Sequence, residues 1–362
     1  MKHWQETSHI VDRIRRVGRQ GRSAALAVVT RVDGSAYRRP GAKLLIEAEG
    51  STLGGISGGC LEEDVRQVGL SVIRSGRSRV LRYDTSDDEA RVWGLGLGCD
   101  GRVEVLVQPV SREAASGPWA RVRRLLQGDS PFALSLIVEE DGLGEVVAVG
   151  PSGRVAGGLG ENAADPAVEA AASGALRDRA TRLEPLGTRL VFTEVLVPPP
   201  RLLVCGAGED ARPLVSFAAA AGFRVFVADH RSAHLAARNF PEAWKLLPLR
   251  PEELSKEIIL DRDACAVVKT HSLKQDAEWV RRLAATDVFY VGILGPRART
   301  KKILADLGIE GDERIYGPVG LDLGADGAEQ VALSVVAELL AVRARREPRH
   351  LRARESAVHA AR

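Results

Sequence analysis

The sequence predicts an α/β protein with two domains, the second of which contains a parallel sheet. From residue 201 onward, strand patterns alternate with helical patterns, which is typical of parallel strands connected by helices. The stretch from Leu202 to Ala211 runs from a strand through Gly-x-Gly-x-x-Ala into a helix, which indicates a Rossmann-like domain. A chain of 362 residues is also long enough for two cores and a connection.

Composition and charge narrow the classes of function. The 51 basic and 48 acidic residues leave a formal net charge of +3, which is too weak to favour nucleic acid as a partner. Aromatic residues make up only 4% of the chain and offer few surfaces for stacking bases. No apolar run approaches the length of a membrane span, and the first residues do not form a secretory signal. We therefore expect a cytoplasmic protein that has no membrane partner.

The first domain is expected over residues 1–115. It opens with an amphipathic helix in which Trp4, Ile10, Ile14 and Val17 share one face. Strands, a second helix and two glycine-rich stretches follow. In order, these are strand 24–32, strand 43–46, glycine-rich stretch 54–60, helix 61–73, glycine-rich stretch 94–101 and strand 102–108.

The middle of the chain, residues 116–200, is rich in alanine, glycine and charged residues. It contains two strand-like islands, 132–138 and 145–149, and we interpret it as an extension and linker. Three prolines at 198–200 make a stiff boundary at its end, because proline favours an extended chain.

The Rossmann-like domain is expected over residues 201–345, with a solvated arginine-rich tail at 346–362. Its expected segments are strands 201–205, 223–228, 264–268 and 288–294, and helices 210–221, 273–285 and 328–345.

The glycine fingerprint favours a dinucleotide or another phosphate ligand. Gly206 permits the tight turn, and Gly208 lets the backbone approach a phosphate. Asp229, at the end of the next strand, stands where a carboxylate binds ribose. Small residues at these places also serve plain packing of a strand on a helix, so the alternative is a fold without a nucleotide.

Later strands end in titratable residues that would meet at the same edge of the sheet. His271 and Arg297 follow two of these strands, at the edge where open α/β sheets bind ligands. Together they favour an anionic ligand. Taken singly, Arg297 fits a solvated arginine of a first helical turn, and His271 fits a hydrogen-bonded loop residue.

The glycine-rich stretch before residue 61 offers a second anion site. Gly58 and Gly59 can present backbone N–H groups to a phosphate or oxyanion. Cys60 at the start of the helix would have its thiolate favoured, as a sulfur ligand or carrier requires. The alternative is a small buried cysteine. Glu62 and Glu63 follow directly and would oppose a nearby thiolate.

Two further features of the first domain fit either a role in ligand binding or a purely structural role. Arg38 and Arg39 can contact an anion, or they can be exposed residues of a turn. Cys99, in the second glycine-rich stretch, faces the same alternatives as Cys60. The four cysteines lack any CxxC pair and the histidines do not cluster with them, which argues against a disulfide framework and a structural zinc site.

A series of ordered blocks resembles the XdhC/CoxI family. The blocks of the first half carry the Arg38-Arg39 turn and the Ser57-Gly58-Gly59-Cys60 loop. Those of the second half resemble the Rossmann domain of the family, and they lie at 206–208, 227–231, 270–271, 290–295 and 318–325. Ordered blocks make chance agreement far less credible than a single glycine motif does.

The resemblance implies an accessory protein that acts as a cofactor chaperone rather than as an enzyme. It would carry molybdenum cofactor as cargo and assist its sulfuration, protection or insertion into a molybdenum hydroxylase such as xanthine dehydrogenase. Cys60 would lie near the molybdenum or its sulfur, as a metal ligand or sulfur carrier. The partner would be the apoenzyme. A cysteine desulfurase and a second copy of the chain, in a homodimer, are possible further partners.

The alternative functions come from other classes. An NAD(P)-dependent oxidoreductase would use the fingerprint from Gly206 to Asp229, with His271 as acid or base. That class has no evident use for Cys60 in a glycine-rich loop. A structural adaptor is the third hypothesis, and it requires that neither loop binds a ligand.

Overall fold

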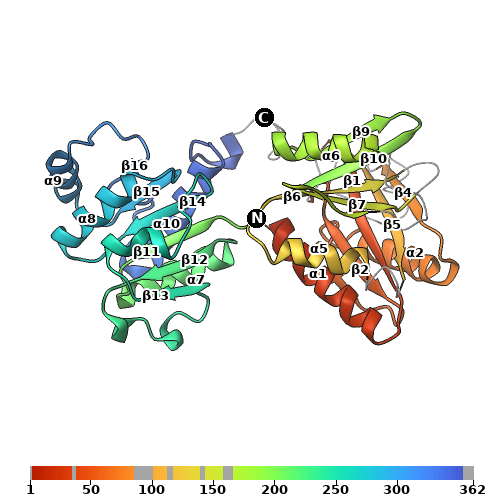
Figure 1. The fold of residues 1–362 in the computed structure, drawn as a ribbon, viewed down its shortest axis with the longest axis horizontal. Helices are drawn as coiled ribbons and strands as arrows, with labels where there is room; N and C mark the ends of the chain where they lie inside the picture. The colour runs from red at the N-terminus through yellow and green to blue at the C-terminus, as the bar shows by residue number, and fades with distance from the viewer. Residues whose placement is uncertain are drawn as a thin grey trace. The chain divides into compact units, whose positions relative to one another are not determined.

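The computed structural model describes residues 2–34, 38–84, 101–111, 117–138, 143–157 and 166–353 (Figure 1). They form two compact units that divide between Pro198 and Pro199, inside the predicted proline boundary. No described helix is long and apolar enough to cross a membrane. Each unit is described by itself.

The first unit is built around two antiparallel sheets of five strands. The first sheet has the order β3-β2-β1-β5-β4 and consists of β1 (Ala24–Gly34), β2 (Lys43–Glu47), β3 (Thr52–Gly54), β4 (Arg79–Asp84) and β5 (Gly101–Val110). The second has the order β8-β7-β6-β10-β9 and consists of β6 (Phe132–Ile137), β7 (Val146–Gly150), β8 (Gly153–Gly157), β9 (Arg182–Leu186) and β10 (Arg189–Leu196).

The helices of this unit cover the faces of the sheets. They are α1 (Lys2–Arg19), α2 (Glu62–Ser75), α5 (Pro118–Leu126) and α6 (Pro166–Asp178). Successive side chains of β1 point to opposite faces, so Leu26 joins a core with Ile14 of α1, whereas Ala27 joins another with Val65 of α2. Helices α1 and α2 therefore lie on opposite faces of the first sheet.

The interpretation of residues 116–200 as an extension and linker differs from the structure. This part supplies α5, the second sheet and α6 to the first unit. Its strands β6 and β7 are buried on both faces, so they lack the alternation of apolar and polar residues by which a half-buried strand is recognised. The strands found in the sequence at 24–32, 43–46 and 102–108 are confirmed.

The second unit contains a parallel six-stranded sheet, which confirms the predicted fold class. Its order is β13-β12-β11-β14-β15-β16, and numbered within the unit this is 3-2-1-4-5-6, the order of dinucleotide-binding sheets. The strands are β11 (Arg201–Cys205), β12 (Arg224–Ala228), β13 (Lys245–Leu247), β14 (Ala264–Val268), β15 (Tyr290–Ile293) and β16 (Ile315–Tyr316). The order reverses between β11 and β14, where such sheets place their ligands.

α-Helices connect β11 to β12, β14 to β15 and β15 to β16, and a fourth follows β16. The α-helices are α7 (Arg212–Ala220), α8 (Leu273–Ala284), α9 (Arg297–Leu307) and α10 (Gly327–Arg343). Short 3₁₀ helices are η1 (Glu209–Ala211), η2 (Ser232–His234), η3 (Ala237–Asn239), η4 (Pro251–Lys256) and η5 (Leu351–Ala353). The part of the predicted tail beyond residue 353 lies outside the described residues.

Candidate functional site

Cys60 lies in the loop that joins β3 to the start of α2. Its thiol is free and half-buried, beside the core between α2 and the first sheet. Cys205 and Cys265 are also free but fully buried, and burial raises the pKa of both thiols. Cys99 lies outside the described residues. Among the described cysteines, Cys60 is therefore the one whose sulfur an external ligand can approach.

The carboxylate of Glu62 holds the beginning of the Cys60 loop. Its Oε1 accepts the backbone N–H groups of Ile56 at 3.2 Å and Ser57 at 2.8 Å, and the Ser57 hydroxyl donates to its other oxygen. Partial burial raises the pKa of Glu62, but the hydrogen bonds from Ser57 outweigh it and hold this pKa below its ordinary value. Two amides of the glycine-rich stretch, next to the predicted Gly58 and Gly59, thus already bind a carboxylate.

Ser57 also ties the middle of the loop together. Its Oγ accepts the backbone N–H of Gly59 at 3.1 Å and that of Leu61 at 3.2 Å. Gly59 has φ +111, a conformation that side chains rarely adopt, and Gly58 and Gly59 are both exposed. The loop around Cys60 is therefore shaped by one serine and one glutamate of its own.

The predicted arginine turn lies in the same unit. Arg38 Nη2 donates to Glu6 Oε2 of α1 at 2.5 Å, and Arg39 is exposed. The turn ends at Gly41, which has φ +94, and a Cβ there would lie 2.5 Å from Glu194 Oε1. Only glycine fits this place without displacing the glutamate.

Glu194 is a buried acid that the sequence reasoning missed. Its carboxylate lies 2.5 Å from Lys43 Nζ and 3.1 Å from His3 Nδ1, and Lys43 also donates to the Gly41 carbonyl oxygen at 2.9 Å. Burial raises the pKa of Glu194, but Lys43 and His3 outweigh it and lower this pKa. The sequence feature that could have revealed it is a single acidic residue within the apolar run of β10, because a buried acid needs a partner. This group anchors the arginine turn to the second sheet.

In the second unit, Gly206 lies where β11 and β14 end side by side. Its φ is +119, and a Cβ would lie 2.5 Å from the carbonyl oxygen of Lys269. Lys269 N–H in turn donates to the Cys205 carbonyl oxygen at 2.9 Å. The fingerprint glycine is therefore required by the close approach of the two strand ends.

Asp229 lies at the same edge, and its carboxylate points at the fingerprint loop. Oδ2 accepts the backbone N–H of Ala207 at 2.9 Å, and Arg231 donates to both oxygens, with Nη2 at 2.9 Å and Nε at 3.0 Å. Burial raises the pKa of Asp229, but the Arg231 guanidinium and the two backbone N–H groups outweigh it and lower this pKa to about 2. Asp229 is thus ionised and already bonded, so a ribose would share it with Arg231.

Asp210 joins the next strand end to the fingerprint loop, and we did not predict its role. Its Oδ1 lies 2.7 Å from Lys269 Nζ, and its Oδ2 lies 3.1 Å from His271 Nε2. Lys269 is buried, and burial lowers its pKa although Asp210 opposes this. His271 is exposed and has φ +62. The signal in the sequence was an acid two residues after Gly208.

Arg297 starts α9 one strand further along the edge, and its side chain is exposed. The neighbouring Arg299 instead pairs with the buried Asp276, which also accepts the backbone N–H of Thr270 at 3.0 Å.

The second unit therefore brings Gly206, Gly208, Asp229 and His271 together, with Arg297 at the next strand end. The other predicted residues belong to the first unit. Among the described residues, no three histidine, cysteine or acidic side chains are arranged to hold a metal ion.

Comparisons with known proteins match both units. A model of the XdhC and CoxI family matches residues 18–84, and a model of the XdhC Rossmann domain matches residues 202–339. These two regions contain most of the motif blocks on which the resemblance rests.

Relatives and a solved structure match nearly the full length. A protein of Bacillus subtilis (strain 168) that is named as a probable subunit of xanthine dehydrogenase is 32% identical, over 89% of this chain and 94% of that one. The molybdenum cofactor insertion chaperone PaoD of Escherichia coli (strain K12) is 25% identical, over 90% of this chain and 86% of that one. A crystal structure described as a xanthine dehydrogenase from Bacillus halodurans aligns with a TM-score of 0.76 at 27% identity, covering 93% of this chain and 96% of that one.

Proposed function

Because the chain belongs to the XdhC and CoxI family, we propose that it binds molybdenum cofactor and assists its sulfuration, protection or insertion into a molybdenum hydroxylase such as xanthine dehydrogenase. The observation that carries this proposal is the similarity to a molybdenum cofactor insertion chaperone along 86% of that protein. In this role the cofactor is cargo, and the chain needs to bind and release it rather than turn it over.

Cys60 is the residue that we propose to contact the cargo. It lies within the segment that matches the family model, and its free thiol is partly exposed at the start of α2. A thiolate is a soft ligand that suits a transition metal or carries sulfur to it. Gly58, Gly59 and the arginine turn at 38–39 would then contact the phosphate of the pterin.

Part of the proposed site in the Cys60 loop is already occupied by a side chain of the protein itself. Because Glu62 occupies the amides of Ile56 and Ser57, an anion that uses those amides must displace the Glu62 carboxylate. We propose that this carboxylate holds the loop until cargo arrives. A carrier that must release its cargo benefits from such an internal competitor, because competition keeps affinity modest.

The partner follows from the same role. We propose the apoenzyme of a molybdenum hydroxylase as the recipient and the cytoplasm as the compartment, where the free thiols of Cys60, Cys205 and Cys265 stay reduced. A cysteine desulfurase as sulfur donor and a homodimer remain predictions. NAD(P) binding at Gly206, Gly208 and Asp229 also remains a prediction, and an oxidoreductase is not favoured because the relatives match both units and include a cofactor chaperone.

The test is retention of the cofactor by anaerobically purified protein. Full-length chain is mixed with molybdenum cofactor and separated by size, and bound molybdenum and pterin are quantified. We expect retention near one per chain, lost in Cys60→Ala and kept in the control Cys265→Ala, which removes a thiol buried in β14. Cys99→Ala examines the second glycine-rich stretch. Equal retention by Cys60→Ala and the unchanged chain would remove Cys60 from the site, and no retention at all would refute the carrier role.

A further inference from the structure

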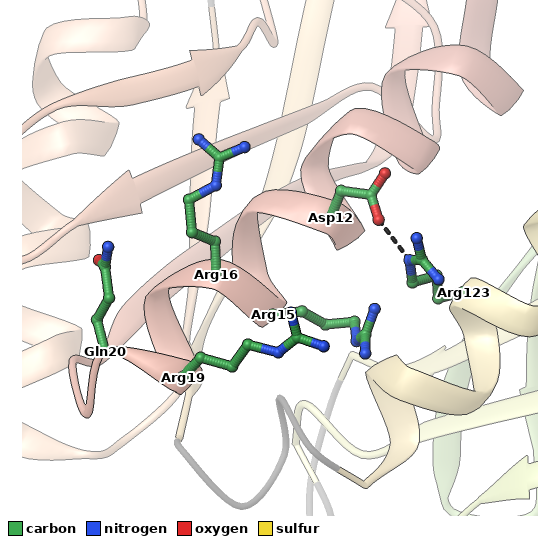
Figure 2. Close-up of a pocket in the computed structure, with 6 residues that line it drawn as sticks. All are labelled: Asp12, Arg15, Arg16, Arg19, Gln20 and Arg123. Carbon is green, nitrogen blue, oxygen red and sulfur yellow. Dashed lines mark hydrogen bonds and ion pairs between the residues drawn. The ribbon is translucent and has the colours of Figure 1, made fainter.

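A basic hollow lies on the first unit between α1 and α5 (Figure 2). Its volume is about 450 Å³, which is in the range of small-molecule pockets. We call it the arginine pocket, and it is lined by Asp12, Arg15, Arg16, Arg19, Gln20 and Arg123.

Four arginines line the arginine pocket against a single aspartate, which leaves a formal excess of three positive charges, although Figure 2 shows Arg16 extending away from the other three. Asp12 Oδ1 lies 2.5 Å from Arg123 Nε, and this pair fixes Arg123 at the wall. Figure 2 shows Arg15 and Arg19 extending along α1 toward the helix that carries Arg123. The pKa of Arg15 is lowered by desolvation and by the like charges of Arg123 and Arg19. An anion among these groups would offset their repulsion.

The helix dipole explains only part of this arrangement. Partial negative charge at a helix carboxyl end favours basic residues, and Arg16, Arg19 and Arg123 all lie in the last turn of their helices. The dipole favours each arginine singly. It does not require two helices to bring their arginines to one hollow with room for a ligand.

The arginine pocket is separate from the Cys60 loop. Helix α1 packs on the face of the first sheet that carries Leu26, whereas Cys60 packs with α2 on the face that carries Ala27. The two sites therefore lie on opposite sides of one sheet, and a ligand in the pocket does not compete with one at Cys60.

We propose that the arginine pocket binds a small anion with two linked phosphate groups. Guanidinium groups bind phosphate oxygens in a bidentate manner, which gives arginine pockets a preference for phosphate. Two phosphate groups carry about three negative charges near neutral pH, which matches the excess charge of the pocket. The proposal does not rest on the carrier role, and its test needs no molybdenum.

The probe is inorganic pyrophosphate, titrated calorimetrically into the full-length chain, with phosphate and citrate as comparison anions. We expect saturable binding of pyrophosphate that is stronger than that of either comparison anion. Arg15→Gln/Arg19→Gln should weaken it by roughly tenfold or more, because two charged hydrogen-bond donors are lost. The matched control is Arg281→Gln/Arg282→Gln, which removes two arginines that pair with Glu278 on the surface of α8.

A second variant tests the charge balance in the opposite direction. Asp12→Asn removes the single carboxylate and frees Arg123, so we expect it to tighten pyrophosphate binding by roughly threefold or more. Misfolding cannot produce such a gain. Absence of saturable binding, unchanged affinity in Arg15→Gln/Arg19→Gln, or citrate binding as tightly as pyrophosphate would each overturn the proposal.

Discussion

The backbone N–H of Ser57 donates to Glu62 Oε1 at 2.8 Å, so the loop that carries Cys60 is held by a carboxylate two residues beyond that cysteine. The bond spans five residues and closes the loop on itself. If an anion replaces the Glu62 carboxylate there, as we propose, the approach to the thiol depends on that side chain.

Glu62→Gln should therefore open the Cys60 loop. The amide keeps the size of the side chain but loses the charge that strengthens its bonds to Ile56 and Ser57. Losing about 1 kcal/mol of closing free energy raises the open population about fivefold, and alkylation of Cys60 by iodoacetamide should accelerate by a similar factor.

The control for this measurement is Glu63→Gln. Glu63 carries the same charge one residue further, but its exposed side chain bonds Arg66 and Gln67 instead of the loop. We expect its alkylation rate to stay near that of the unchanged chain. If both variants react equally fast, charge alone governs the rate and Glu62 does not hold the loop.

Removing one partner of the buried pair Lys43–Glu194 should lower the unfolding free energy far more, per residue changed, than removing both partners together. Both side chains are 2% exposed, so Lys43→Met leaves an ionised Glu194 in the core. We expect a loss of about 3–5 kcal/mol of unfolding free energy from either single change, Lys43→Met or Glu194→Gln, in urea denaturation.

The double variant Lys43→Met/Glu194→Gln completes this cycle. Its loss should be clearly smaller than the sum of the two single losses, because no charge of the pair is left unpaired. Asp178→Asn, which breaks an exposed pair with Arg182, is the surface control and should cost less than about 1 kcal/mol. Additive losses in the double variant would contradict the coupling.

The parallel sheet could be predicted from the sequence because strand and helix patterns alternate there, and the fingerprint marks the first crossover. The contact between Lys43 and Glu194 could not, because it joins residues 151 positions apart. Such a contact depends on how two sheets pack, which no local pattern encodes. The bond between Ser57 and Glu62 spans only five residues, but the place of Glu62 in the first helical turn predicts an effect on a nearby thiolate and not this bond. The sequence predicts that Asp229 lies at the ligand-binding edge of the sheet. It does not predict that the Asp229 carboxylate bonds the Ala207 N–H and the Arg231 guanidinium.

Stability should depend on Asp229 in a defined range of pH. The pKa of Asp229 is lowered to about 2 in the folded chain, so its stabilising contribution is present above the unfolded value near 4 and is lost as pH falls toward 2. At pH 7 this contribution is about 2 kcal/mol. Asp229→Asn should be less stable by about that amount, and the difference should shrink by about half between pH 5 and pH 3.

The measurement is urea denaturation of the unchanged chain and Asp229→Asn across that range. Asp178→Asn serves again as a control, because its partner Arg182 holds it at the surface and its difference should stay small throughout. A difference for Asp229→Asn that does not change with pH would mean that the variant acts through shape rather than through charge.

Gly206→Ala should show how much of the fingerprint is required by the fold itself. The added Cβ would lie 2.5 Å from the carbonyl oxygen of Lys269, and backbone of two parallel strand ends cannot move apart without loss of the sheet. Gly153→Ala is the matched control, because Gly153 has a similar positive φ, of +105, but open space around its Cβ position.

We expect about 1–3 kcal/mol of destabilisation in Gly153→Ala, from backbone conformation alone. Gly206→Ala should lose several kcal/mol in thermal or urea unfolding, because the steric clash adds to the same backbone cost. The difference between the two isolates the close approach of β11 and β14. Equal losses would mean that Gly206 serves only the turn, and its role would then have to come from a ligand that approaches its backbone.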